Sequence, residues 1–229
     1  MMTDINKEQN SFNSFDCFKS LEKKDFDFQK YKSKQLEYLS GETLFKQGAF
    51  APYILYIING LVKIYLQTGP DKQMNIRIAK TGEFLAFSTI FGDDIYNYSA
   101  VALKNSNICM IEKESMKQVL IENPDFALMI TSKNYKHEKH LLDIIKNISH
   151  KQMRGKLASS LLYLSQNEFK EHNIFTLLKR QDIADFASIS TESTIKFLKE
   201  FETESIIKLQ GKNIEILQND KLNDIARRG

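Results

Sequence analysis

Histidine and cysteine are the residue types of this 229-residue sequence with the widest chemical range, and none stands in a spacing that predicts catalysis. No histidine has a credible nucleophile beside it in sequence, and no HExxH, GxSxG or glycine-rich phosphate loop occurs. Cys17 and Cys109 lie far apart, which argues against a disulfide framework, a four-cysteine zinc site or an iron–sulfur cluster. We therefore expect a protein that is not an enzyme.

Three residues could be ligands of a haem or a metal ion. His137 and His140 lie in a segment with helical spacing, and Cys109 lies in a β-rich run, so haem or metal ligation by these residues is the alternative. A histidine among Lys and Glu on a helix is more often a solvated surface group. We expect no cofactor, although an effector of unknown identity is compatible with the sequence.

Composition places the chain among ordinary globular proteins. A hydrophobic fraction of 42% is enough to bury a sizeable core, and the net charge of +3 permits an acidic partner without requiring one. The first residues are polar and lack the apolar core of a signal peptide, and no apolar run approaches the length of a membrane span. These features predict a cytoplasmic protein without a membrane partner.

Glycine placement indicates a β-rich first half. Six of the nine glycines fall between positions 41 and 92, and β-rich runs separate them, as in a small sandwich or barrel. The run YILYII (53–58) is uniformly apolar and predicts a central strand. LVKIYL (61–66) and MNIRIA (74–79) alternate, which predicts one buried face and one solvated face. Three further strands are expected at EFLAF (83–87), YSAVAL (98–103) and NICMIE (107–112).

The period becomes helical after Pro124. The apolar residues of the following segment cover too broad a surface for one side of a lone helix; they include Leu141, Ile144, Ile145 and Ile148. Such a helix is expected where it packs on its own domain and on a second subunit. Packing of the helix within a single chain is the alternative.

The segment KRQDIADFASISTESTIKFLKEFETESIIKLQGKNIEI, residues 179–216, combines two helical patterns with a hairpin pattern. Residues 180–187 predict a short helix with one buried face, and residues 188–189 break it. Ser190 can accept a backbone N–H as the N-cap of a second helix, which we expect to run to about Glu204. Two helices joined by such a short turn form a helix-turn-helix, whose second helix can enter a DNA major groove.

The second helix is predicted to bury Ile195, Leu198 and Phe201. The runs SIIKLQ and NIEIL, on either side of Gly211, then predict a β-hairpin that forms a wing. Together these signals resemble the winged helix of the Crp/Fnr transcription regulators. Upstream, LFKQGAFAPYILYIINGLVKIYL and GEFLAFSTIFG resemble the β-roll of that family, ENPDF precedes its dimer helix, and QMRGKLASSLLYLS resembles the helix after its hinge.

The resemblance implies an α+β protein in four parts. A polar N-terminal segment (1–25) precedes a β-roll sensor domain (26–125) that is similar to cyclic nucleotide-binding domains. A dimerisation helix (126–150) and a winged helix-turn-helix domain (151–229) follow. The resemblance also implies a homodimer that binds double-stranded DNA at a palindromic operator, with RNA polymerase as a further partner if the protein is an activator.

DNA-contacting positions are carried over from the family residue by residue. Base reading falls on Thr191, Glu192 and Lys196, of which Glu can accept from cytosine and Lys can donate to guanine. Phosphate contacts fall on Arg180, Ser190 and Ser193, and the resemblance adds Gln181 to the interface. Two plainer roles stay open, because Glu192 could offset the helix dipole and Lys196 could be an ordinary solvated lysine.

The predicted winged helix contains equal numbers of positive and negative side chains. Residues 179–212 hold six basic and six acidic side chains, which predicts modest non-specific affinity for DNA.

The sensor departs from the cyclic-nucleotide pattern. Glu83 matches the family's phosphate-binding segment, but Tyr98 stands where an arginine would hold the cyclic phosphate, and Ser99 alone cannot neutralise it. Leu141 and Leu142 stand where a polar pair would reach the base. These five residues line the expected effector pocket, and control by cyclic AMP is not expected. The alternative function is a small-molecule-binding regulatory protein whose winged helix contacts other proteins.

Overall fold

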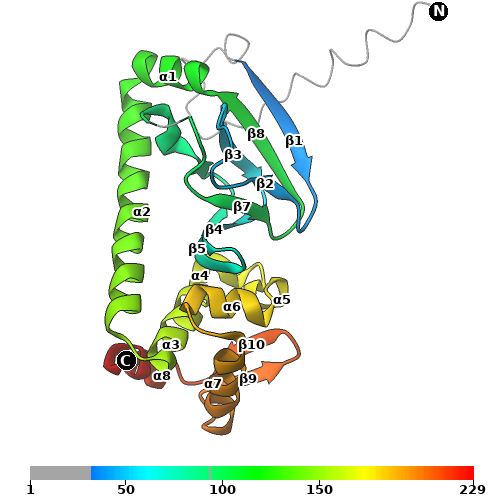
Figure 1. Ribbon diagram of the computed structural model, residues 1–229, viewed down its shortest axis with the longest axis vertical. Helices are drawn as coiled ribbons and strands as arrows, with labels where there is room; N and C mark the ends of the chain where they lie inside the picture. Colours follow the sequence, from blue (N-terminus) through cyan, green and yellow to red (C-terminus); the bar gives the residue numbers. More distant parts are fainter. Residues whose placement is uncertain (1–31, 93) are drawn as a thin grey trace, which may run out of the picture.

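The computed structural model describes residues 32–92 and 94–229, so the N-terminal segment expected at residues 1–25 lies outside the described part. Within it, a β-roll, a long helix and a mostly helical C-terminal domain follow one another along the chain (Figure 1). The predicted α+β architecture is confirmed.

Eight strands in two four-stranded sheets build the β-roll. Their bounds are β1 Ser33–Tyr38, β2 Thr43–Phe45, β3 Tyr53–Asn59, β4 Leu61–Gly69, β5 Lys72–Lys80, β6 Phe84–Leu85, β7 Ser99–Ala102 and β8 Ser106–Glu112. The sheet orders are β1-β8-β3-β6 and β2-β7-β4-β5. As predicted, β3 is a central strand, with four consecutive buried residues from Ile54 to Ile57. The strand predicted at 83–87 is shorter, because Ala86 takes a left-handed conformation (φ 58°) and starts a 3₁₀ turn at Phe87–Ile90.

Where the predicted runs 61–66 and 74–79 pair in the β4–β5 ribbon, no residue is exposed on either face, so the predicted solvated face is wrong. Lys63 of β4 is 7% exposed and Asn75 of β5 is 1% exposed. The ladder also carries a register shift, since Ile64 lies opposite Arg77 whereas Tyr65 lies opposite Asn75. Ile76 is therefore an extra residue, and the strict alternation of faces that the sequence predicts is interrupted there.

Helix α1 (Lys113–Glu122) follows the β-roll, and helix α2 (Pro124–His150) then runs along its side and down to the C-terminal domain (Figure 1). Pro124 occupies the first turn of α2, where its missing N–H costs nothing. Near its start α2 buries Phe126 and Ile130 against the β-roll, but further on Leu142 and Ile145 are 61% and 60% exposed. No helix of the described residues is both long and apolar enough to cross a membrane.

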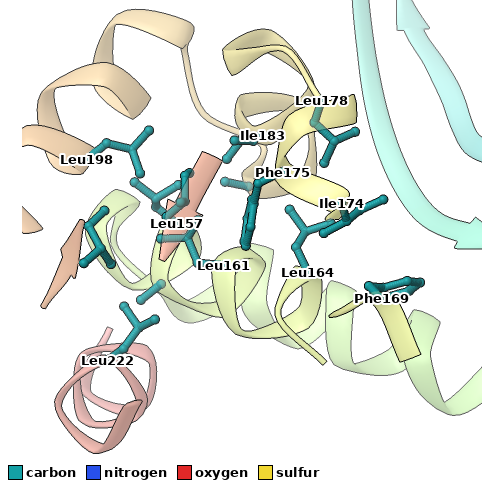
Figure 2. Close-up of a cluster of buried hydrophobic side chains, with 14 of the residues drawn as sticks. Leu157, Leu161, Leu164, Phe169, Ile174, Phe175, Leu178, Ile183, Leu198 and Leu222 are labelled. Atoms are coloured by element: carbon teal, nitrogen blue, oxygen red, sulfur yellow. The ribbon is translucent and has the colours of Figure 1, made fainter. Parts of the chain in front are cut away.

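The C-terminal domain comprises six helices and one hairpin within the described residues. Their bounds are α3 Met153–Leu164, α4 Asn167–Lys170, α5 Ile174–Leu177, α6 Arg180–Ala187, α7 Thr191–Thr203, β9 Ile207–Gln210, β10 Asn213–Ile216 and α8 Asn219–Arg228. Figure 2 shows its core, in which Leu157, Leu161 and Leu198 meet between the helices. Helix α8 closes this core with Leu222, and the sequence patterns did not single out that helix.

One hydrophobic cluster spans the β-roll and the C-terminal domain. Leu61, Ile78 and Leu103 of the β-roll belong to the same buried cluster as the core shown in Figure 2. At its edge the Lys63 ammonium forms an ion pair with the Asp182 carboxylate of α6, and the two side chains are only 9% and 13% exposed. The two domains therefore share a continuous packed boundary.

Replacing Lys63 by Ala should leave the Asp182 carboxylate buried without its cation, at a cost of about 3–5 kcal/mol. The matched control is Lys80→Ala, because the Lys80–Glu168 pair also joins the two domains but its side chains are 37% and 39% exposed, so its loss should cost about 1 kcal/mol or less. Urea unfolding followed by circular dichroism measures both changes. Equal shifts for the two variants would contradict the assignment of Lys63 as a buried structural charge.

Candidate nucleic-acid interface

Helices α6 and α7 form the helix-turn-helix that the sequence predicts. Between them Ser188 adopts a left-handed conformation (φ 52°), which ends α6 abruptly. The Ser190 hydroxyl accepts the Ser193 backbone N–H at 3.1 Å, so the predicted N-cap is confirmed. Ile183 and Ala187 anchor α6 in the core. The turn and the cap together fix the direction in which α7 leaves the domain.

Helix α7 has one buried face and one exposed face, and its first buried residue lies one position before the predicted one. Thr194, Leu198 and Phe201 are buried at a four-then-three spacing, whereas Ile195 is 42% exposed, so its predicted burial is wrong. The Thr194 hydroxyl bonds to the Ser190 carbonyl, which lets a polar residue occupy the inner face. The exposed residues recur at i, i+3, i+4 and i+7: Glu192, Ile195, Lys196 and Lys199.

The predicted base-reading residues lie at the start and on the exposed face of α7. The Thr191 hydroxyl bonds to the Gln181 amide oxygen of α6. Glu192 is fully exposed, and its own backbone N–H together with the Ser190 side chain lowers the pKa of its carboxyl. Lys196 is exposed, with its ammonium 5.8 Å from the centre of the Phe197 ring.

Arg180 holds the wing in place. Its guanidinium donates to the carbonyls of Gly211 and Lys212 at 2.8 and 3.1 Å, and burial lowers its pKa. Gly211 takes a left-handed conformation (φ 62°) in the turn between β9 and β10. Arg180 therefore ties the first turn of α6 to the tip of the wing, where Lys212 is exposed.

The equal numbers of basic and acidic residues in 179–212 do not describe the charge of the exposed surface, because several of the acidic side chains are paired. Asp182 and Asp185 of α6 face the β-roll, not solvent, and Glu204 accepts a two-point hydrogen bond from Arg154 of α3 at 2.6 and 2.7 Å. Glu200 lies 3.8 Å from the same guanidinium. Five lysines of the region stay exposed: Lys179, Lys196, Lys199, Lys208 and Lys212. The surface around α7 and the wing is therefore more basic than the sequence count implies.

Inside the β-roll, the Glu83 carboxylate has two side-chain partners that the sequence patterns did not assign to it. Arg77 pairs with the Glu83 carboxylate, and His137 of α2 lies 3.6 Å from it. Burial alone would raise the pKa of Glu83, but the hydrogen bond from His137 and the charge and hydrogen bond of Arg77 keep it below its ordinary value. The sequence pattern did not predict an inward-facing Arg77, because the register shift at Ile76 places Arg77 opposite Ile64 of the β-roll core.

The five predicted effector-pocket residues have different surroundings, because Glu83, Tyr98 and Ser99 belong to the β-roll whereas Leu141 and Leu142 lie on α2. Burial raises the pKa of Tyr98, and its hydroxyl accepts the Ala86 backbone N–H at 2.6 Å. The buried Ser99 hydroxyl accepts the Gln47 backbone N–H at 2.9 Å. Leu141 and Leu142, in contrast, are 42% and 61% exposed on α2.

Two cavities stand out among the described residues, and neither is lined by the five predicted residues. The larger, about 1130 Å³, lies between the C-terminal half of α2 and the C-terminal domain. The smaller, about 50 Å³, lies where α2, α3, β5 and α6 meet. Among the described residues, no group of three or more His, Cys, Asp or Glu side chains is arranged to hold a metal ion.

Comparison with known proteins gives two matches that follow the domains. Residues 35–123 match the family model described as cyclic nucleotide-binding domain, and residues 155–225 match the Crp-like helix-turn-helix domain. The cAMP-activated global transcriptional regulator CRP of Salmonella typhimurium is 24% identical over 184 residues, which are 79% of this chain and 88% of that protein. The fumarate and nitrate reduction regulatory protein of Vibrio cholerae is 26% identical over 190 residues, 81% of this chain and 76% of that protein.

Solved structures agree on the fold. FixK2 from Bradyrhizobium japonicum superimposes with a TM-score of 0.71 at 15% identity, over 85% of this chain and 97% of its own. The c-di-GMP responsive global regulator CLP of Xanthomonas campestris gives a TM-score of 0.72 at 18% identity, over 80% of this chain and 93% of its own. The molecule is a helix-turn-helix regulator with a cyclic nucleotide-binding-like domain. The chain belongs to the Crp/Fnr family of transcription regulators.

Proposed function

We propose that this protein binds a palindromic operator in double-stranded DNA as a homodimer and regulates transcription there. The observation that carries the proposal is the exposed face of α7. It presents Glu192, Ile195 and Lys196 on a helix whose opposite face is fully buried and whose start is capped by Ser190. A rigid helix that projects both polar and apolar side chains is suited to reading base edges in a major groove.

The three exposed side chains suit three different base edges. Lys196 can donate to guanine O6 or N7, and Glu192 can accept from cytosine N4. Ile195 offers an apolar contact for the thymine methyl group, a role that the sequence prediction missed by placing it in the core. Thr191 lies at the same end of the helix, bonded to Gln181.

Of the residues near the DNA backbone, some are expected to contact phosphates directly and others to hold the contacting groups in position. Ser190 and Ser193 form the cap of α7, so their part is mainly to place the backbone N–H groups of that helix end. Arg180 supports the wing, which carries Lys208 and Lys212 toward the backbone of the duplex. These lysines supply the charge that binds DNA regardless of sequence.

The exposed stripe of α2 supports the homodimer. Leu128, Tyr135 and Leu142 recur every seven residues and are 68%, 67% and 61% exposed, with Ile145 beside them at 60%. This seven-residue repeat is typical of a helix that pairs with a second helix. Ile144, in contrast, packs against the β-roll core, and Ile148 is partly buried, so they are expected to contribute less than Leu141 and Ile145.

Independence from cyclic AMP is the third part of the proposal. A bound cyclic phosphate needs a free cation, but Arg77 is already paired with Glu83. Tyr98 offers only a neutral hydroxyl, which accepts the Ala86 N–H and can donate one hydrogen bond but carries no positive charge. We expect no metal or haem cofactor, a cytoplasmic location, and contact with RNA polymerase where the operator position makes the protein an activator.

Replacing Glu192 or Lys196 by Ala should each cost about 1–3 kcal/mol on the operator and little on random DNA, because one base contact per half-site is lost. The operator is first obtained by selecting genomic fragments with purified protein, and half-sites about one helical turn apart are expected. Lys212→Ala is the control, since losing a phosphate contact should weaken both DNAs and lower the salt slope by about one. Arg180→Ala should also weaken both DNAs.

Two results would count against this reading. Equal losses on operator and random DNA for Glu192→Ala would show that Glu192 reads no base. A selection that enriches no palindrome would favour the alternative in which the winged helix contacts proteins.

Ile145→Asp should dissociate the dimer and weaken operator binding together, since burying each exposed apolar side chain of α2 contributes on the order of 1.5–3 kcal/mol. Leu39→Asp is the control, because Leu39 is 54% exposed but lies in the β-roll between β1 and β2. Sedimentation velocity at micromolar concentration measures the mass. A wild-type monomer under those conditions would rule out the dimer.

Cyclic AMP and cyclic GMP should neither bind at micromolar concentration nor change operator affinity by as much as about tenfold at millimolar concentration. The reason is the Arg77–Glu83 pair, which a cyclic phosphate would have to break. Calorimetry with each nucleotide measures this, and the cAMP-activated regulator of Salmonella typhimurium is the positive control. Micromolar binding of either nucleotide would overturn our interpretation of Tyr98.

A further inference from the structure

A chain of side-chain hydrogen bonds connects the β-roll to the first residue of the recognition helix α7. The Gln73 amide of β5 donates to one oxygen of Asp185 at 2.7 Å. The Gln181 amide donates to the other Asp185 oxygen, also at 2.7 Å. The Thr191 hydroxyl then bonds to the Gln181 amide oxygen. Four residues from three elements are thus joined without a gap.

The buried carboxylate at the centre fixes the direction of every bond in this chain. Asp185 is 6% exposed, and no described lysine, arginine or histidine forms an ion pair with it. An ionised carboxylate only accepts hydrogen bonds, so both glutamines must turn their NH₂ groups toward it. The Gln181 oxygen therefore faces Thr191, whose hydroxyl must donate to it. The orientation of the Thr191 side chain at the start of α7 therefore depends on Gln73 of β5.

We propose that Gln73 is a positioning residue for base readout and acts through Asp185 and Gln181 on Thr191. This inference rests on the proposed reading of DNA by α7. Gln73 belongs to the β-roll, and its polar contact with the C-terminal domain is the one to Asp185. Without the Gln73 amide, the Asp185 carboxylate loses one of its two neutral donors in a buried position and must reorient. Gln181 and Thr191 then lose their fixed arrangement.

A separate set of contacts holds α6 as a body, which keeps the two effects apart. The Asp182 carboxylate pairs with Lys63, and the Asp182 carbonyl accepts the Asn75 amide at 2.9 Å. A change at Gln73 leaves both contacts in place. It should therefore alter the discrimination between DNA sequences while the seating of α6 and the phosphate contacts persist.

The experiment compares the ratio of operator affinity to random-DNA affinity in matched variants. Gln73→Ala should lower this ratio by about three- to tenfold, the effect of one buried hydrogen bond, and leave the salt slope unchanged. Gln67→Ala is the control, because Gln67 lies directly opposite Gln73 in the β4–β5 ladder but has its hydrogen bonds to described residues within its own hairpin turn and with Gln47. It should keep the wild-type ratio.

A charge exchange tests the chain itself. Gln73→Glu places a carboxylate against Asp185 and should lower the ratio at least as much as Gln73→Ala. Adding Asp185→Asn should restore the ratio, because the new amide at position 185 can donate to the new carboxylate at position 73 and still accept from Gln181. In a Thr191→Val background, which lacks the last hydroxyl, Gln73→Ala should have no further effect on the ratio.

The outcomes separate this inference from the function on which it rests. A wild-type protein without any operator preference would refute both. A wild-type preference that Gln73→Ala leaves unchanged would refute the inference alone. So would equal losses of Gln73→Ala on operator and random DNA, because they would mean a merely structural role.

Discussion

The seating of α6 on the outer face of β4 and β5 is the contact on which the rest of the molecule depends. Leu61 and Ile78 join the core of the C-terminal domain, and the Lys63–Asp182 pair lies at the edge of that boundary. An apolar boundary tolerates small displacements, but a buried ion pair is favourable only in one geometry. The other Asp182 oxygen accepts the Lys179 N–H at 2.7 Å, so the same carboxylate caps α6 and fixes it to the β-roll. The orientation of the helix-turn-helix is thereby tied to the β-roll.

The packing of α6 on the β-roll also determines which charged side chains remain exposed around α7 and the wing. The acidic side chains of α6 contact the β-roll, and Glu200 and Glu204 near the end of α7 pair with Arg154, whose guanidinium lies 5.0 Å from the centre of the Phe201 ring. Within residues 179–212 the exposed charged residues are five lysines, Glu192 at the start of α7 and Glu202 near its end. The single exposed carboxylate on the first turn would repel phosphates, so its presence there is compatible with base reading and costs non-specific affinity.

Local patterns in the sequence were sufficient for the helix-turn-helix and insufficient for the contacts between domains. The ends of α6 and the cap at Ser190 depend on residues that are close in sequence, and both were predicted. The exposure of Ile195 depends on a shift of one position, because a buried Thr194 is possible only once its hydroxyl finds the Ser190 carbonyl. The burial of Lys63 depends on Asp182, 119 residues later in the chain, and no local period carries that information. Charge partners at such separations are set by the tertiary fold.

Strand β5 contacts both the interior of the β-roll and the helix-turn-helix domain. Its extra residue at Ile76 turns Arg77 toward Glu83 in the roll, while Gln73 and Asn75 on the other side of the shift contact α6. His140 of α2 contacts the Ile76 carbonyl at 3.1 Å and stacks on Tyr163 of α3, whose hydroxyl accepts the Ile78 N–H at 2.9 Å. Had β5 alternated regularly, Arg77 would share a face with Asn75 and the roll would lack its guanidinium. The bulge thus gives one strand two sets of partners, and the Arg77–Glu83 pair and the contacts to α6 share one backbone.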